Sequence, residues 1–120
     1  MPTSRVFIPQ RPLMKVFNDE KQEWEWVNKW DLSEAENYGT ITPILSSQAK
    51  PFSPEPIIAE IKAALHDFND NDHIIAIGNP ALLAWCVAIA AYFNQGYVTM
   101  LQWSSIERTY VAIEADLGMR

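Results

Sequence analysis

The turn Gly78-Asn79-Pro80 is the stretch best suited to ligand chemistry, and it follows the apolar run His73–Ile77. The run is short, rich in β-branched residues and free of polar alternation, so it predicts a strand covered on both faces. Glycine permits a tight turn, asparagine caps helices, and proline suits the first helical position. Free N–H groups at such a strand-to-helix turn favour a phosphate, nucleotide or carboxylate. The alternative is a capped helix without a ligand, because one glycine is not the dinucleotide motif and no P-loop lysine follows.

The loop before this run is rich in histidine and carboxylates, as a metal site would be. It contains His66, Asp67, Asn69, Asp70, Asn71, Asp72 and His73. However, Asp72 stands where a calcium-binding EF-hand loop needs glycine, and Gly78 stands where it needs glutamate. We therefore interpret the loop as a solvated connection and predict no metal site and no cofactor.

Nucleophilic catalysis has little support in the sequence. The single cysteine, Cys86, lies within the apolar stretch Ala81–Phe93, where burial would raise its pKa and no basic residue is near. The serine pairs lack the Gly-x-Ser-x-Gly pattern of a hydrolase elbow. The sequence favours a non-enzymatic protein, with no catalytic residue predicted.

Three tryptophans, Trp24, Trp26 and Trp30, lie within seven residues of one another. Tryptophan is enriched at the energetic centres of protein interfaces, so these residues are candidates for a protein-binding surface. The alternative is that they cover one face of a sheet within the monomer. Glu23 and Glu25, which alternate with the tryptophans, argue against base stacking with nucleic acid, because phosphates would meet carboxylates.

The elements that must position these residues alternate along the chain. Leu13–Phe17 and Glu23–Val27 predict a hairpin around a polar turn, and Thr40–Leu45 predicts an edge strand because of Pro43. Pro54–Phe68 predicts an amphipathic helix with Ser53 as cap. Tyr97–Trp103 and Arg108–Glu114 predict a second hairpin.

This order predicts an α/β fold: a small β-α-β-α-β core with parallel central strands, extended by antiparallel N-terminal and C-terminal hairpins. The three parallel strands are expected near residues 40–45, 73–77 and 97–103. Val6–Ile8 is expected to be a short strand that Pro9 and Pro12 break or confine to an edge. The stretch Ala81–Phe93 has no charged residue, so we expect a helix buried on most sides. Residues 1–120 are expected to form a single α/β domain.

Composition restricts the partners. The formal net charge is −6, with −1 on residues 1–50 and −5 on residues 51–120. This acidity argues against direct nucleic-acid binding and is compatible with a protein partner that has a basic surface. The lone cysteine fits a reducing cytoplasm, MPTSRVFIPQ lacks the apolar segment of a signal peptide, and no apolar run approaches the roughly 20 residues of a membrane span.

Several short segments together resemble a group of small, uncharacterised proteins of tailed bacteriophages. They are Val6-Phe7-Ile8-Pro9, Asp31-Leu32-Ser33 with Tyr38-Gly39, Ile77-Gly78-Asn79-Pro80, and Leu101-Gln102-Trp103. The resemblance spans most of the chain. It implies a phage protein made in the cytoplasm of the bacterial host, and it transfers no activity and no functional residue.

Three functions are compatible with these features. The first is a protein-interaction module that binds and modulates a host or phage protein, with homodimerisation through a sheet edge or the Trp face. The second is a small ligand-binding or enzymatic domain that uses Gly78, Asn79 and Pro80. The third is a structural component of the virion.

Overall fold

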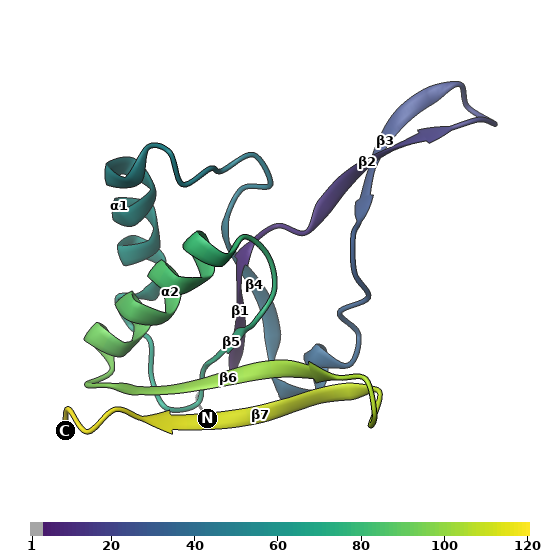
Figure 1. The fold of residues 1–120 in the computed structure, drawn as a ribbon. Helices are drawn as coiled ribbons and strands as arrows, with labels where there is room; N and C mark the ends of the chain where they lie inside the picture. The colour runs from purple at the N-terminus through teal and green to yellow at the C-terminus, as the bar shows by residue number, and fades with distance from the viewer. Residues whose placement is uncertain (1–3) are drawn as a thin grey trace.

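The computed structural model describes residues 4–120 and shows a five-stranded sheet, two helices against one face, and a projecting hairpin (Figure 1). Residues 1–3, the start of MPTSRVFIPQ, lie outside the described residues. The strands are β1 (Arg5–Gln10), β2 (Leu13–Asn18), β3 (Glu23–Asn28), β4 (Thr40–Leu45), β5 (His73–Ile75), β6 (Tyr97–Ser104) and β7 (Thr109–Asp116). The helices are the 3-10 helix η1 (Ala35–Tyr38), α1 (Pro54–Leu65) and α2 (Pro80–Phe93).

The main sheet has the strand order β4-β1-β5-β6-β7. Strands β4, β1, β5 and β6 are parallel, and β7 pairs antiparallel with β6. The predicted parallel strands near residues 40–45, 73–77 and 97–103 are thus present, although β5 ends at Ile75. The predicted C-terminal hairpin is confirmed as β6 and β7.

Strand β1 lies in the middle of the parallel sheet, between β4 and β5. The prediction gave two alternatives, that Pro9 and Pro12 break the Val6–Ile8 strand or confine it to an edge. The edge position is wrong, whereas the strand does end, at Gln10, before Pro12. Strand β5 pairs only with Val6 and Phe7, so Pro9 lies beyond the end of that pairing. Proline has no N–H to donate to a neighbouring strand, but no hydrogen bond with β5 is lost at Pro9, because β5 does not extend to that point. Pro43 lies on the edge strand β4, as predicted.

The core has two layers, one on each face of the sheet. On one face, α1 and α2 cover Phe7, Ile74 and Val98. The predicted apolar stripe of α1 is confirmed, since Ile57, Ile61 and Leu65 are its buried residues. Within residues 4–120, no long helix covers the opposite face. A smaller cluster forms there, consisting of Val6, Ile8, Ala35, Ile75, Leu101 and Tyr110.

Helix α2 is less enclosed than its sequence predicts. Leu82, Cys86 and Ala90 are buried against the sheet and α1, but the outer face exposes Ala84, Ala88 and Tyr92. The expectation of a helix buried on most sides holds in part. The half-buried apolar residues of α2 also pack against the core, and only the outer stripe, which no second layer of the described chain covers, is exposed. Small alanine side chains make this exposure tolerable, since each adds little apolar surface.

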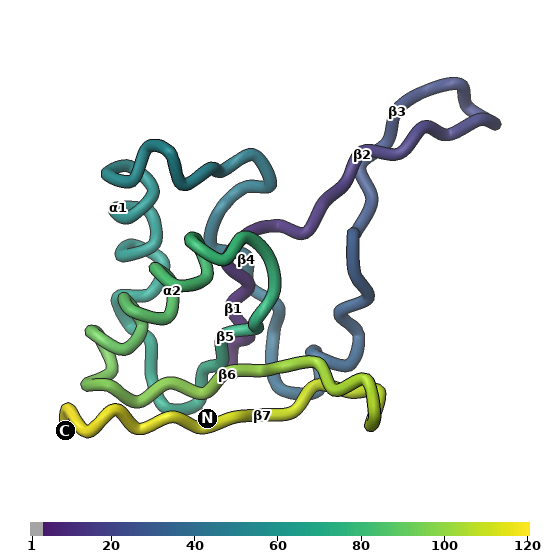
Figure 2. The backbone as a smooth tube through the Cα atoms, in the orientation of Figure 1, coloured from purple at the N-terminus to yellow at the C-terminus, as the bar shows by residue number. Residues whose placement is uncertain are grey.

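The N-terminal hairpin of β2 and β3 is confirmed, and it forms a two-stranded sheet of its own. Figure 2 shows that the hairpin projects from the body and is joined to it by two connecting segments, one that follows β1 and one that leads to η1. We refer to residues 13–28 as the arm. Most of its side chains are exposed or half-buried, so the arm presents both faces to the surroundings.

Candidate functional site

The pairing of β2 with β3 gathers aromatic side chains on one face of the arm. Lys15 is opposite Trp26, and Phe17 is opposite Trp24. Because side chains alternate between faces of a strand, these four share one face. Glu23 and Glu25 lie on the other face. The tryptophans and glutamates alternate in sequence, and the strand therefore places them on opposite faces of the arm.

The aromatic face is ordered by contacts within the arm. The rings of Phe17 and Trp24 meet edge to face, with centroids 5.3 Å apart. The Nζ atom of Lys15 lies 5.8 Å from the Trp24 ring and 6.0 Å from the Trp26 ring. Trp24 nevertheless remains 62% exposed and Trp26 52% exposed. We call Lys15, Phe17, Trp24 and Trp26 the aromatic face.

Trp30 lies apart from this face. It is at the base of the arm, where it lines an apolar hollow of about 360 Å³ with Ile77, Trp103 and Tyr110. Lys29 lies over its ring at 5.0 Å. Of the three tryptophans singled out in the sequence, the structure therefore brings Trp24 and Trp26 together and places Trp30 against the body.

The turn Gly78-Asn79-Pro80 joins β5 to α2, with a short segment between. The Asn79 side chain accepts hydrogen bonds from the N–H groups of Ala81 at 2.9 Å and Leu82 at 3.3 Å. The N–H of Leu83 donates to the Asn79 carbonyl at 3.0 Å. The first donors of α2 are thus already used, so the N-terminus of this helix has little left to offer an anion.

A hollow of about 410 Å³ lies beside this turn, at the carboxyl ends of β1 and β5. It is lined by Gln10, Arg11, Lys29, Trp30 and Asn79, among others. Sequence reasoning missed Arg11 and Lys29. A signal for them was present in the sequence, because Arg11 comes before the first strand of the predicted hairpin and Lys29 comes after the second. Antiparallel pairing brings the start of one strand beside the end of the other.

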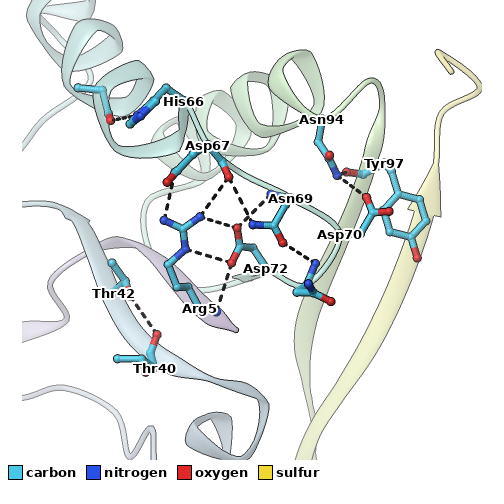
Figure 3. A network of polar contacts seen from close by, with 12 residues as sticks. Arg5, Thr40, Thr42, His66, Asp67, Asn69, Asp70, Asp72, Asn94 and Tyr97 are labelled. Carbon is cyan, nitrogen blue, oxygen red and sulfur yellow. Dashed lines mark hydrogen bonds and ion pairs between the residues drawn. The ribbon is translucent and has the colours of Figure 1, made fainter. Parts of the chain in front are cut away.

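The acidic loop before β5 forms a network of ion pairs and hydrogen bonds (Figure 3). The buried carboxylate of Asp72 accepts from the Arg5 side chain at 2.7 and 3.1 Å, from the Arg5 N–H and from the Asn69 N–H. Arg5 also pairs with Asp67 at 3.1 Å, and the Asp72 carboxylate raises the pKa of the Arg5 guanidinium. The loop thus fastens the start of β1 to the start of β5.

The same loop offers no metal centre. Within residues 4–120, no three His, Cys, Asp or Glu side chains are grouped so as to hold a metal ion. Asp70 is held by Arg120 and Asn94, and these partners lower the pKa of its carboxyl. The carboxylates point into several separate contacts rather than toward one centre.

Cys86 is fully buried on α2, and burial raises its thiol pKa to about 12. A thiol with that pKa carries almost no thiolate at neutral pH, so it is a poor nucleophile.

Within residues 4–120, no helix is long and apolar enough to cross a membrane.

The fold and these sites define an open α/β sheet protein with a projecting aromatic arm and a cationic hollow at the arm's base. The chain belongs to the Phage Pam3 gp32-like protein family, whose model matches residues 4–117. It is therefore a bacteriophage protein, as the resemblance in its sequence suggested. Neither the curated proteins nor the solved structures compared with it include a match.

Proposed function

We propose that the chain is a non-enzymatic interaction protein of the phage, which binds a partner protein through the aromatic face of its arm. The observation that carries this proposal is the exposure of Trp24 and Trp26 on a hairpin that pairs with no other strand of the described chain. An isolated two-stranded hairpin is at best marginally stable in water. A partner that covered the arm would stabilise it and would remove large apolar surfaces from water.

The size of the effect is sufficient for specific recognition. Burying a large apolar side chain contributes about 2 kcal/mol, and tryptophan often supplies more at an interface. The cross-strand contacts of Phe17 with Trp24 and of Lys15 with both tryptophans hold the rings in place. Such ordering in the free protein reduces the entropy cost of binding.

The charges on the arm define the partner further. Lys15 is the charged residue on the aromatic face, whereas Glu23 and Glu25 occupy the opposite face. The partner surface that fits is therefore an apolar groove flanked by carboxylates. Complementary charge of this kind raises the association rate and selects among partners.

The experiment combines capture with substitution. The tagged protein and the variant Trp24→Ala/Trp26→Ala are used to capture partners from phage-infected host lysate, and any candidate is then purified and titrated against both by calorimetry. Phe52→Ala and Tyr92→Ala are matched controls, because these aromatic side chains are 85% and 74% exposed elsewhere on the body.

Binding that is lost in the arm variant and retained in both controls supports the proposal. Equal binding of the arm variant would contradict it. Light scattering of the free protein distinguishes self-association: a dimer that dissociates in the arm variant would make the partner a second copy of this chain.

A further inference from the structure

We propose that the hollow at the base of the arm binds the phosphate group of a nucleotide between Arg11 and Lys29, with the ring system of the ligand against Trp30. This inference is independent of the partner protein bound by the aromatic face.

The topology of the sheet places the hollow where open α/β sheets bind ligands. From β1 the chain passes by way of the arm and η1 to β4 on one side, and from β5 it passes by way of α2 to β6 on the other side. The connections that leave β1 and β5 therefore diverge, and a crevice opens at the carboxyl ends of these two strands. The hollow occupies this position, since Gln10 ends β1, Arg11 follows it, and Gly78 and Asn79 follow β5.

Backbone hydrogen bonds hold the main chain of Arg11 and Lys29 at the hollow. The N–H of Arg11 donates to the carbonyl of Leu45 at 3.0 Å, and the N–H of Lys29 donates to the carbonyl of Pro12 at 2.6 Å. Gln10 is held as well, since its amide donates to the carbonyls of Ser47 and Ala49. A site built on such anchored positions requires little reorganisation when a ligand binds.

The electrostatics favour an anion. No aspartate or glutamate lines this hollow. Asp31 and Glu36 line a neighbouring hollow that shares Arg11, Lys29 and Trp30 with this one, but no carboxylate in residues 4–120 forms an ion pair within 4.0 Å with either cation. Two cations without a carboxylate partner thus line the same hollow, in a chain of formal net charge −6. A guanidinium fork and an ammonium group together match phosphate oxygens well.

The rest of the hollow suits the remainder of a nucleotide. Trp30 is 37% exposed, and because Lys29 lies over its ring at 5.0 Å, the aromatic surface open to a ligand is the exposed remainder of the ring beside the cations. Gly78 has a φ of +104°, and a Cβ built there would meet no atom within 4 Å, so the turn leaves open space at the wall. A volume of about 410 Å³ lies within the range of small-molecule sites.

The test is calorimetric titration of the purified protein with AMP, ADP, GDP and FMN, and separately with inorganic phosphate. We expect saturable binding of at least one nucleotide, weakened about tenfold by Arg11→Gln and by Lys29→Gln, since each removes a charge-assisted hydrogen bond. Trp30→Leu should weaken the nucleotide and leave inorganic phosphate unchanged. Lys50→Gln and Lys62→Gln, which alter cations away from the hollow, are the matched controls and should bind normally.

Circular dichroism of each variant checks that it is folded. The proposal is overturned if no nucleotide binds at millimolar concentration, or if Arg11→Gln and Lys29→Gln bind as well as the controls. Binding of inorganic phosphate alone, with no contribution from Trp30, would also overturn the assignment to a nucleotide. The variant Trp24→Ala/Trp26→Ala should retain nucleotide binding, so failure here and failure of the interaction proposal are distinguishable.

Discussion

The two edges of the parallel sheet use charge in opposite ways. At the amino edge, where the parallel strands begin, the buried carboxylate of Asp72 accepts hydrogen bonds from Arg5 and from the Asn69 N–H, so its charge is neutralised within the fold. At the carboxyl edge, Arg11 and Lys29 line a hollow and have no carboxylate within 4.0 Å in residues 4–120. A buried charge must be paired to be tolerated, whereas an exposed cation can stay free for a ligand. The first edge supports stability, and the second is available for binding.

Breaking the amino edge should have the largest effect. Asp72→Asn removes the charge that neutralises Arg5 and should lower the free energy of unfolding by about 3 kcal/mol. Urea denaturation measures this difference. The matched control is Asp67→Asn, because Asp67 also pairs with Arg5 but its side chain is 56% exposed. Its cost should lie below about 1 kcal/mol. Similar losses in both variants would contradict the assignment of the amino edge as structural.

The cap of α2 should rank second. Asn79→Ala removes the side-chain oxygen that accepts from Ala81 and Leu82, and should cost about 1 kcal/mol. Asn79→Asp should restore most of the loss. Ser53, at the same position of α1, makes no side-chain capping hydrogen bond, so Ser53→Ala should leave stability nearly unchanged. Denaturation curves of the three variants compare the two helix starts, and equal losses at both would contradict the role given to Asn79.

Protonation of His73 should have a smaller effect, because the ring is only partly enclosed. Burial lowers the pKa of His73 in the folded protein, and Asp72 and Glu114 oppose this change. The unfolded chain therefore binds the proton at a higher pH than the folded chain does. The stability that neutral His73 contributes should be complete above about pH 6.5 and should decrease as pH falls below it.

Melting temperatures measured across this range, for the wild type and His73→Phe, isolate the contribution. The phenyl ring keeps the contact with Tyr38, whose ring centroid lies 5.5 Å from that of His73. The variant should therefore lose this part of the pH dependence. An unchanged pH profile in His73→Phe would assign the effect to other groups.

Substitution at the carboxyl edge should have the smallest effect on stability. Arg11→Gln and Lys29→Gln remove exposed cations that have no carboxylate partner in residues 4–120, so each should change the free energy of unfolding by less than about 0.5 kcal/mol. Urea denaturation measures it beside Asp72→Asn. A large loss in either variant would mean that these cations support the fold, and the contrast between the two edges would disappear.

The sequence predicted most of the elements because their signals are local. Alternation of Trp24 and Trp26 with glutamates predicted the arm strand, and the stripe of α1 predicted its buried side. Position within the sheet was harder to predict. The prolines near β1 indicated an edge strand, yet β1 lies between β4 and β5. Pro9 is tolerated there because β5 is short and pairs with β1 only as far as Phe7. Strand order depends on contacts between residues far apart in the chain, which no local pattern records.

The candidate sites divide in the same way. The turn at Gly78 and the cap at Asn79 were predictable, since both depend on neighbouring residues. Whether the turn can bind an anion was not predictable, because only the structure shows that the Asn79 cap already accepts hydrogen bonds from the first N–H groups of α2. The expectation for α2 holds only in part: its lack of charge predicted burial, but the arrangement of layers determines whether an outer layer covers its exposed stripe.

The sequence by itself determined the α/β class, the hairpin and the phage family, because composition, periodicity and turn residues act over a few positions. The tertiary structure decided that the arm stands away from the body and that Trp30 separates from Trp24 and Trp26. It also decided that Arg11 and Lys29 line the same hollow, at the crevice between β1 and β5. These outcomes depend on how distant strands pair, since a side chain's neighbours across a sheet are set by topology and register rather than by its own segment.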